Sequence, residues 1–353
     1  MGIKGNLTIE EVIEAGIENF SIIDVRSPSE YIQDHIPSAV NIPLLDDRER
    51  KEIGIIYKHE GPEKAKLRGV DIVSPKLPQF IRQIQQVYEK RKPVIIYCWR
   101  GGLRSEASVS FARLAGITAS KLNGGYKSYR KYVINYLEHI DKKIKFITLF
   151  GPTCSGKTEL LELLRQKGLP VLNLEKYARH KGSVFGHIGE AEYPQITQKK
   201  FESELFFDIY KGKSNIYFTE GESSKIGKIT VPKTIFQKIK SSIKILIDAD
   251  IDFRIDFAIK SYKPELYENE ILSCLENIKH YVSKDFFENL RYLLHKKNFR
   301  EFTRQIMLYY YDPLYKKGLG DGFDYNITLK SLEDTVDELI KIYKSISTPV
   351  SSA

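Results

Sequence analysis

The segment 98–105 reads CWRGGLRS, and its cysteine is a candidate nucleophile. The segment lies between a predicted strand and a predicted helix, so backbone N–H groups of the turn can converge on the sulfur and on an adjacent anion. Arg100 and Arg104 would favour the thiolate form of Cys98 and hold that anion. We therefore predict Cys98, Arg100 and Arg104 as catalytic residues. The competing interpretation is an inert cysteine buried at the end of a strand.

A second segment, 151–158, reads GPTCSGKT and fits the phosphate-binding pattern GxxxxGK[ST] between a predicted strand and a predicted helix. Lys157 would neutralise a bound phosphate, and Thr158 could hold Mg²⁺. Such a loop holds any diphosphate or triphosphate, so the pattern does not by itself indicate NTP hydrolysis. Cys154 is expected to be a small residue that the loop tolerates. The predicted phosphate ligands are Gly151, Thr153, Ser155, Gly156, Lys157 and Thr158.

Three polar segments follow this loop, at 173–175, 178–186 and 219–227. The first is expected to end a strand, the second is punctuated by glycines, and the third follows another predicted strand. In an extended chain Glu220 and Glu222 point to the same side, which suits metal binding or proton transfer. His180, Ser183 and Ser223 are further candidates for this site. Each segment could instead be a polar turn at a sheet edge.

The elements that must position these residues alternate between strands and helices, which predicts an α/β protein with two parallel sheets. We expect one domain over 1–140 and a second over 141–353, with a helical insertion at about 260–320. In the first domain, strands are predicted at 21–25 and 94–97, one helix at 77–88, and a second helix that follows Ser105 and ends at Gly116. In the second, strands are predicted at 145–150, 171–174, 216–219, 243–247 and 324–329, and helices at 158–166 and after Ser331.

Two further segments of the first domain, DVRSPSEY at 24–31 and HIPSAVNIP at 35–43, resemble the opening of a rhodanese domain. Together with the Cys98 loop, the resemblance covers about the first 130 residues. It implies a cysteine that carries a persulfide or perselenide. The loop from Cys98 to Arg104 has seven residues, whereas ordinary sulfurtransferase rhodaneses have six and their phosphatase relatives have seven. Loop length alone therefore leaves sulfur, selenium and phosphate chemistry open.

The complete order of motifs resembles the tRNA 2-selenouridine synthase family. After the rhodanese-like part come a P-loop NTPase-like domain, then HxGSxFG from His180, QxxFE at 198–202, ExESxxIG from Glu220, and Arg254. The resemblance implies replacement of sulfur by selenium in wobble 2-thiouridine of tRNA, with selenophosphate as selenium donor and geranyl diphosphate as the donor for S-geranylation. It also implies a site role for Arg254. Cys154 departs from the glycine usual in this family, and Lys181 and Lys225 replace frequent arginines.

Two other functions remain compatible with the residues: a P-loop kinase or NTPase fused to a sulfurtransferase, and a non-catalytic module that senses sulfur or redox state. The residues also leave open whether Cys98 carries selenium or accepts the departing group. A metal other than Mg²⁺ is not expected, because three cysteines and seven histidines are scattered along the chain.

The chain has 353 residues and a formal net charge of +9, which favours an anionic partner. No apolar stretch approaches the roughly 20 residues of a membrane-spanning helix, so we expect a cytoplasmic protein without a membrane partner. The expected partners are tRNA and an enzyme that supplies selenophosphate. The basic excess concentrates at 121–145 and 291–304, although solvated helix faces could explain both clusters. The candidate tRNA contacts are Trp99, Lys127, Arg130, Lys131, Arg291, Lys296, Lys297, Arg300 and Arg304.

Overall fold

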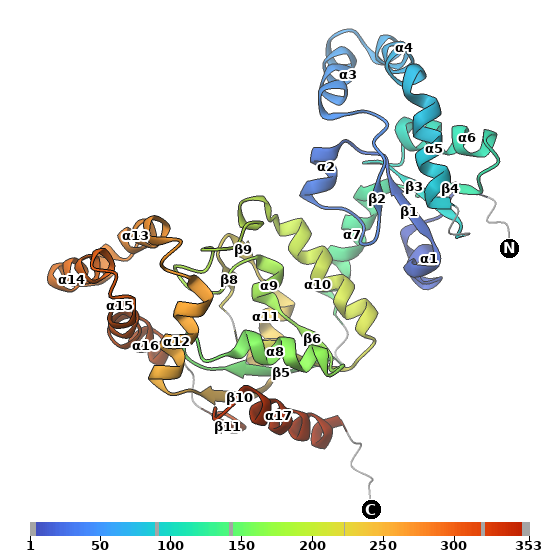
Figure 1. Cartoon of the computed structure of the whole chain (residues 1–353). Coiled ribbons are helices and arrows are strands. Elements are labelled where there is room, and N and C mark those ends of the chain that lie inside the picture. The colour runs from blue at the N-terminus through green and yellow to red at the C-terminus, as the bar shows by residue number, and fades with distance from the viewer. Residues whose placement is uncertain (1–4, 89–91, 141–143, 222, 319–321, 348–353) are drawn as a thin grey trace, which may run out of the picture. The chain divides into compact units, whose positions relative to one another are not determined.

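The computed structural model describes residues 5–88, 92–140, 144–221, 223–318 and 322–347, which form two compact units (Figure 1). The N-terminal unit contains the described residues up to Leu137 together with Thr197–Phe207. The P-loop unit contains the remaining described residues, from Glu138 to Ile196 and from Asp208 onward. Each unit has its own parallel sheet, so the predicted α/β class is confirmed.

The N-terminal unit is built on a four-stranded parallel sheet, and one of its two central strands ends just before the predicted nucleophile. Val94–Tyr97 is a run of apolar and aromatic residues buried on both faces, as expected for a parallel strand. Cys98 follows it directly, at the carboxyl edge of the sheet where parallel α/β folds place chemistry. In the order β2-β1-β3-β4 the strands are β1 (Ser21–Asp24), β2 (Val40–Asn41), β3 (Val94–Tyr97) and β4 (Ala119–Lys121).

Helices cover this sheet and bury its apolar side chains. Capping boxes at Thr8 and Asp46 satisfy the first N–H groups of two of them. Ile84 of one helix and Ala112 of another join Ile23 and Ile96 in the core. The helices are α1 (Ile9–Glu14), α2 (Pro28–Gln33), α3 (Asp47–His59), α4 (Pro62–Val73), α5 (Leu77–Tyr88), α6 (Leu103–Leu114) and α7 (Gly125–Glu138), with short 3-10 turns at Ile17–Asn19 and Ser74–Lys76.

The N-terminal unit also includes the first part of α10 (Gln198–Gly212). The QxxFE motif lies here: the side chain of Gln198 donates to Glu202, which forms an ion pair with Arg130 of α7. The Ser203 hydroxyl donates to the buried carboxylate of Asp34 at 2.9 Å. Burial raises the pKa of Asp34 despite this bond. The motif and the serine that follows it therefore supply partners to two buried charges of this unit.

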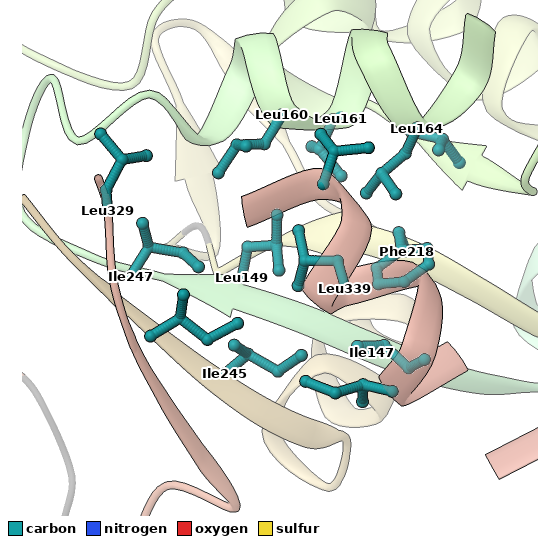
Figure 2. Close-up of a cluster of buried hydrophobic side chains, with 14 of the residues drawn as sticks. Ile147, Leu149, Leu160, Leu161, Leu164, Phe218, Ile245, Ile247, Leu329 and Leu339 are labelled. Carbon is teal, nitrogen blue, oxygen red and sulfur yellow. The ribbon is translucent and has the colours of Figure 1, made fainter. Parts of the chain in front are cut away.

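The P-loop unit has a five-stranded parallel sheet with P-loop strand β5 at its centre. Helices α8 (Lys157–Gln166) and α17 (Leu332–Ser347) pack on one face of it. Figure 2 shows Leu160, Leu161 and Leu164 of α8 above the side chains of the sheet, and Leu339 of α17 between Leu149 and Phe218. The other labelled sheet residues are Ile147, Ile245 and Ile247. In the order β11-β10-β5-β7-β6 the strands are β5 (Lys145–Phe150), β6 (Val171–Leu172), β7 (Ile216–Glu220), β10 (Ile243–Asp248) and β11 (Tyr325–Thr328).

The strand predicted at 171–174 ends earlier, at Leu172, because the Asn173 side chain caps a helix that begins at Leu174. Helices also fill the connection from β10 to β11, and one turn there, Met307–Tyr311, is a π-helix. The other elements of the unit are α9 (Leu174–Ala178), the hairpin β8 (Lys225–Ile226) and β9 (Ile229–Thr230), α11 (Lys233–Lys240), α12 (Ile251–Tyr262), α13 (Glu268–Glu276), α14 (Lys284–His295), α15 (Phe299–Ile306) and α16 (Asp312–Gly318), with 3-10 turns at Tyr193–Gln195 and Lys279–Tyr281.

Substituting Leu339 by alanine should lower the free energy of unfolding by about 3 kcal/mol, because the fully buried side chain leaves a cavity between α17 and the sheet. Urea unfolding followed by circular dichroism measures this change. The matched control is Leu266→Ala, since Leu266 is 70% exposed and should cost less than about 0.5 kcal/mol. Equal effects of the two substitutions would contradict the packing described here.

Candidate functional site

The Cys98 loop is held tightly against the start of α7. The N–H groups of Tyr126 and Lys127 donate to the carbonyl oxygens of Cys98 and Trp99, both at 2.9 Å. Gly125 permits this approach, since a Cβ there would lie 2.2 Å from the Cys98 oxygen. Cys98 is 4% exposed, and its Sγ lies 3.2 Å from the Ser105 hydroxyl. The loop thus presents one sulfur with a hydroxyl group beside it.

The two predicted arginines of the loop differ in their surroundings. Arg100 is exposed, whereas Arg104 donates to Glu30 at 2.8 Å. Glu30 also pairs with Arg50 at 3.2 Å. Burial would raise the pKa of Glu30, but the hydrogen bond and charge of Arg104, together with Arg50, lower it below its usual value. Sequence reasoning missed Glu30 and Arg50; the only local signal was the capping box that begins at Ser27.

The phosphate-binding loop turns into α8 at Gly156, whose backbone is left-handed. The Lys157 ammonium folds back onto the carbonyl oxygens of Gly151, at 2.8 Å, and Pro152, at 3.2 Å. Cys154 is also left-handed, with φ of 63°, and burial raises the pKa of its thiol to about 12. This thiol therefore stays protonated near neutral pH.

Two carboxylates stand behind the loop. The Thr158 hydroxyl donates to Glu175 at 2.7 Å, and the Glu175 N–H donates to Glu220 at 2.6 Å. These oxygens match the ligand preference of Mg²⁺, so the residues fit that ion. Glu222 lies outside the described residues. Within the part of the chain that the structure describes, three or more His, Cys, Asp or Glu residues do not gather as a metal-binding group.

A pocket of about 900 Å³ opens above the phosphate-binding loop. Six of the seven loop residues from Gly151 to Lys157 line it, and so do Thr158, Glu175, Ser183 and Ser223. The predicted phosphate ligands and two of the later candidates are therefore brought together. Glu220 reaches the pocket wall through its bond to Glu175. His180 and Arg254 contact the residues around the pocket and do not form its lining.

Arg254 supports the loop from outside the pocket. It is 4% exposed, donates to the Thr153 carbonyl oxygen at 3.0 Å and makes a bidentate pair with Asp312. Three residues later, the Tyr315 hydroxyl accepts the N–H of Gly151 at 2.6 Å. Neither Asp312 nor Tyr315 was predicted, although a tyrosine-rich run at 309–315 was visible in the sequence.

A family model described as "tRNA 2-selenouridine synthase AAA domain" matches residues 144–344, more than half of the chain, and a model of a rhodanese-like domain matches 9–132. The chain belongs to the tRNA 2-selenouridine synthase family. The resemblance stated from the motifs is thereby confirmed.

Curated relatives of this family carry the name "tRNA 2-selenouridine synthase". The protein of Bdellovibrio bacteriovorus is 37% identical over 251 residues, 69% of this chain and 65% of that protein. The protein of Nitrosomonas eutropha is 33% identical, covering 73% and 66%. The protein of Shewanella denitrificans is 30% identical over 325 residues, covering 83% and 87%. The chain thus spans slightly less than two thirds of the first two relatives and most of the third.

The family motifs around His180 form a packed contact. The ring is 7% exposed and lies between two glycines: a Cβ would approach it to 2.6 Å at Gly186 and also at Gly227. Burial, with the nearby His187 and Lys181, lowers the pKa of His180 to about 4. The glycines of HxGSxFG and ExESxxIG thus allow His180 to join the loop at 178–186 to the β8–β9 hairpin.

The candidate tRNA contacts of this family member fall into different environments. Trp99 is half-buried, 5.2 Å from the ring of Tyr126, with the Lys199 ammonium 5.3 Å from its centroid. Arg130 is 8% exposed and engaged by Glu202. Three arginines of the second cluster form ion pairs: exposed Arg291 with Glu288, and exposed Arg300 and half-buried Arg304 both with Asp252. The exposed lysines among the candidates are Lys127, Lys131, Lys296 and Lys297. None of the helices among the described residues is long and apolar enough to cross a membrane.

Stability should fall as the pH decreases from 7 to 5, by about 2 kcal/mol from His180 alone. The folded state keeps the imidazole ring neutral, whereas in the unfolded chain the ring binds a proton below the ordinary histidine pKa of 6.5. Protonation therefore stabilises the unfolded state relative to the folded state as the pH decreases. Urea midpoints measured at several pH values test this. His180→Asn removes the titrating group and should flatten the pH dependence; an unchanged slope in that variant would refute the assignment.

Proposed function

We propose that this protein is a transferase that converts wobble 2-thiouridine of tRNA into 2-selenouridine. Geranyl diphosphate would supply a geranyl group to the sulfur, and selenophosphate would supply selenium. The two chemical steps would be divided between regions 1–140 and 141–353, the second carrying a helical insertion at about 260–320. We further propose a cytoplasmic location and an enzyme that supplies selenophosphate as a partner. Family membership supports the overall reaction.

The observation that carries the geranylation step is a second, apolar cavity that touches the phosphate-binding loop. Its volume is about 50 Å³, several times the space that one water needs. Thr153, Cys154, Ser183 and Tyr262 line both this cavity and the large pocket, so a phosphate site and an apolar site meet at the loop. A prenyl diphosphate has this same division between charged head and aliphatic chain. The apolar wall is formed by Phe185, Ala258, Ile259, Ile271, Phe302, Ile306 and Met307.

The residues of the loop suit departure of the diphosphate. The thiouridine sulfur would attack C1 of the geranyl group, the C1–O bond would break, and the diphosphate would leave with the bonding electron pair. Lys157 and the N–H groups of the loop would stabilise the charge that develops on it. When bound, Mg²⁺ held by Thr158, Glu175 and Glu220 would neutralise more of that charge. Arg254 would act as a positioning residue, because it holds the Thr153 carbonyl group.

The Cys98 loop would serve the selenium step. Geranylation makes the sulfur a better leaving group. The selenium of selenophosphate would attack C2 of the uridine base, and the C–S bond would break as geranylthiolate leaves with the bonding electron pair and takes up a proton. Water would then cleave the Se–P bond, which releases inorganic phosphate and leaves 2-selenouridine. Exposed Arg100 is oriented by no hydrogen bond that the structure describes and would be available to the phosphate of selenophosphate. Arg104 would contribute while held by Glu30. For tRNA we propose Trp99, Lys127, Lys131, Arg291, Lys296, Lys297, Arg300 and Arg304 as contacts, and buried Arg130 as support for α10.

Mass spectrometry of wobble uridines tests the reaction directly. After incubation of the protein with 2-thiouridine tRNA, geranyl diphosphate and selenophosphate, we expect 2-selenouridine. Cys98→Ala should abolish selenium incorporation, and Lys157→Ala should reduce geranylation at least 100-fold, because the loop loses its phosphate counter-charge.

Cys274→Ala is the matched control for the first variant, since Cys274 is buried within the helical insertion. Undiminished selenium incorporation by Cys98→Ala would contradict the proposal. Rapid ATP turnover at a rate that tRNA does not change would favour the kinase or NTPase alternative.

Filling the apolar cavity should separate head-group binding from chain binding. Ala258 is 5% exposed and lines the cavity, so Ala258→Leu should weaken geranyl diphosphate binding about 10-fold or more while inorganic pyrophosphate binding changes less than about 2-fold. Isothermal titration with both ligands measures this difference. Ala258→Ser, similar in size to alanine, is the control. Equal weakening of both ligands by Ala258→Leu would argue against a prenyl chain in this cavity.

A further inference from the structure

One face of the P-loop sheet is only partly covered beside the phosphate-binding loop. In the parallel register Lys244 pairs with Thr148 and Leu246 pairs with Phe150, so these four side chains point to the same face. Lys244, Leu246 and Phe150 are only half-buried. The opposite face differs, because its central side chains Ile147, Leu149, Ile245 and Ile247 are fully buried under α8 and α17 (Figure 2).

The large pocket extends from the phosphate-binding loop along this half-open face. At the far end its lining includes Phe236, Ile239 and Lys240 of α11 and Lys244 of β10. Aromatic rings of Phe150, Phe257 and Tyr315 line it as well. The lining of the pocket therefore reaches from the loop to two lysines, and the aromatic residues nearest to them are Phe236 of α11 and Phe150 of β5. We call this part of the pocket the α11 arm.

The two lysines of the α11 arm, Lys240 and Lys244, carry positive charge without an ion-pair partner among the described residues. The Lys240 ammonium lies 4.7 Å from the ring centroid of Phe236. The nearby carboxylate of Asp324 accepts the backbone N–H of Lys244 at 2.7 Å. Cations thus stand at both ends of the pocket, with Lys157 at the loop and this pair at the end of the α11 arm.

A prenyl diphosphate would bind only one of these two groups of lysines, because its negative charge is confined to the diphosphate. A single RNA strand carries a phosphate at every nucleotide and a flat base between phosphates, which matches lysines beside aromatic rings. We infer that the α11 arm binds the single-stranded anticodon loop, with backbone phosphates on Lys240 and Lys244 and a base against Phe236. This inference rests on the proposed function, because it gives the RNA substrate a place next to the proposed prenyl donor.

These residues lie outside both basic clusters that the sequence singled out, at 121–145 and 291–304. They became visible only through the register of β10 on β5 and the position of α11. The arrangement would bring a base of the bound strand toward the phosphate-binding loop, where the apolar cavity also opens. The nucleobase sulfur and the first carbon of the prenyl chain would then meet at the loop.

The test uses the full-length protein and a 17-nucleotide anticodon stem-loop that carries 2-thiouridine, with binding followed by fluorescence anisotropy at several salt concentrations. Lys240→Gln and Lys244→Gln should each weaken binding about 3-fold to 10-fold, and each should reduce the slope of log K against log salt by about 0.7 to 1. Binding of geranyl diphosphate should change less than about 2-fold. Lys240→Arg and Lys244→Arg keep the charge and should bind RNA like the wild type.

Lys341→Gln is the matched control, because Lys341 is exposed on α17, on the other side of the sheet. If Lys240→Gln and Lys244→Gln bind the stem-loop with the same affinity and salt dependence as this control, the inference is wrong. This holds even if the wild-type protein forms 2-selenouridine. If the lysines carry RNA binding but neither geranylated nor selenated uridine forms, the inference stands and the proposed function fails. Failure of the wild type to bind the stem-loop at low salt would overturn the inference.

Discussion

The bidentate pair between Arg254 and Asp312 is the interaction on which the P-loop unit most depends. Through Arg254 it holds the Thr153 carbonyl group, and through α16 it brings Tyr315 to the N–H of Gly151. The pair is nearly buried, so losing either partner would leave a charge without compensation, at a cost of several kcal/mol. The helices between β10 and β11 thereby become part of the wall of the pocket at this loop.

Site residues could be predicted from the sequence where their role depends on neighbouring residues, and not where it depends on partners far away in the chain. The phosphate-binding loop was predictable because its function resides in eight consecutive residues whose backbone geometry is local. Glu30, which holds Arg104 across 74 positions, and Tyr315, which reaches Gly151 across 164, have no local pattern. Their roles follow from strand order and helix placement, which one sequence does not specify. His180 was predicted as a site residue; the structure adds that two glycines enclose its ring.

The two units use their loops differently. In the N-terminal unit the α7 N-terminus donates to loop carbonyl groups, which fixes the backbone around a single sulfur. In the P-loop unit the lysine of the loop contacts loop carbonyl oxygens and a hydroxyl group, all of which a phosphate could replace. The first loop is thus hydrogen-bonded through its carbonyl groups around the candidate nucleophile Cys98, whereas the internal hydrogen bonds of Lys157 in the second could be exchanged for bonds to a ligand.

The position of α10 limits how this protein could have been assembled from simpler ones. Residues 197–207 complete the N-terminal unit, yet they follow more than 50 residues of the P-loop unit in the chain. A fragment that stopped at residue 140 would lack Glu202 and Ser203, which pair with Arg130 and Asp34 in the complete chain. The rhodanese-like part is therefore not a module that could be exchanged at a single junction. An exchange of this unit in the present chain would have to replace both segments together.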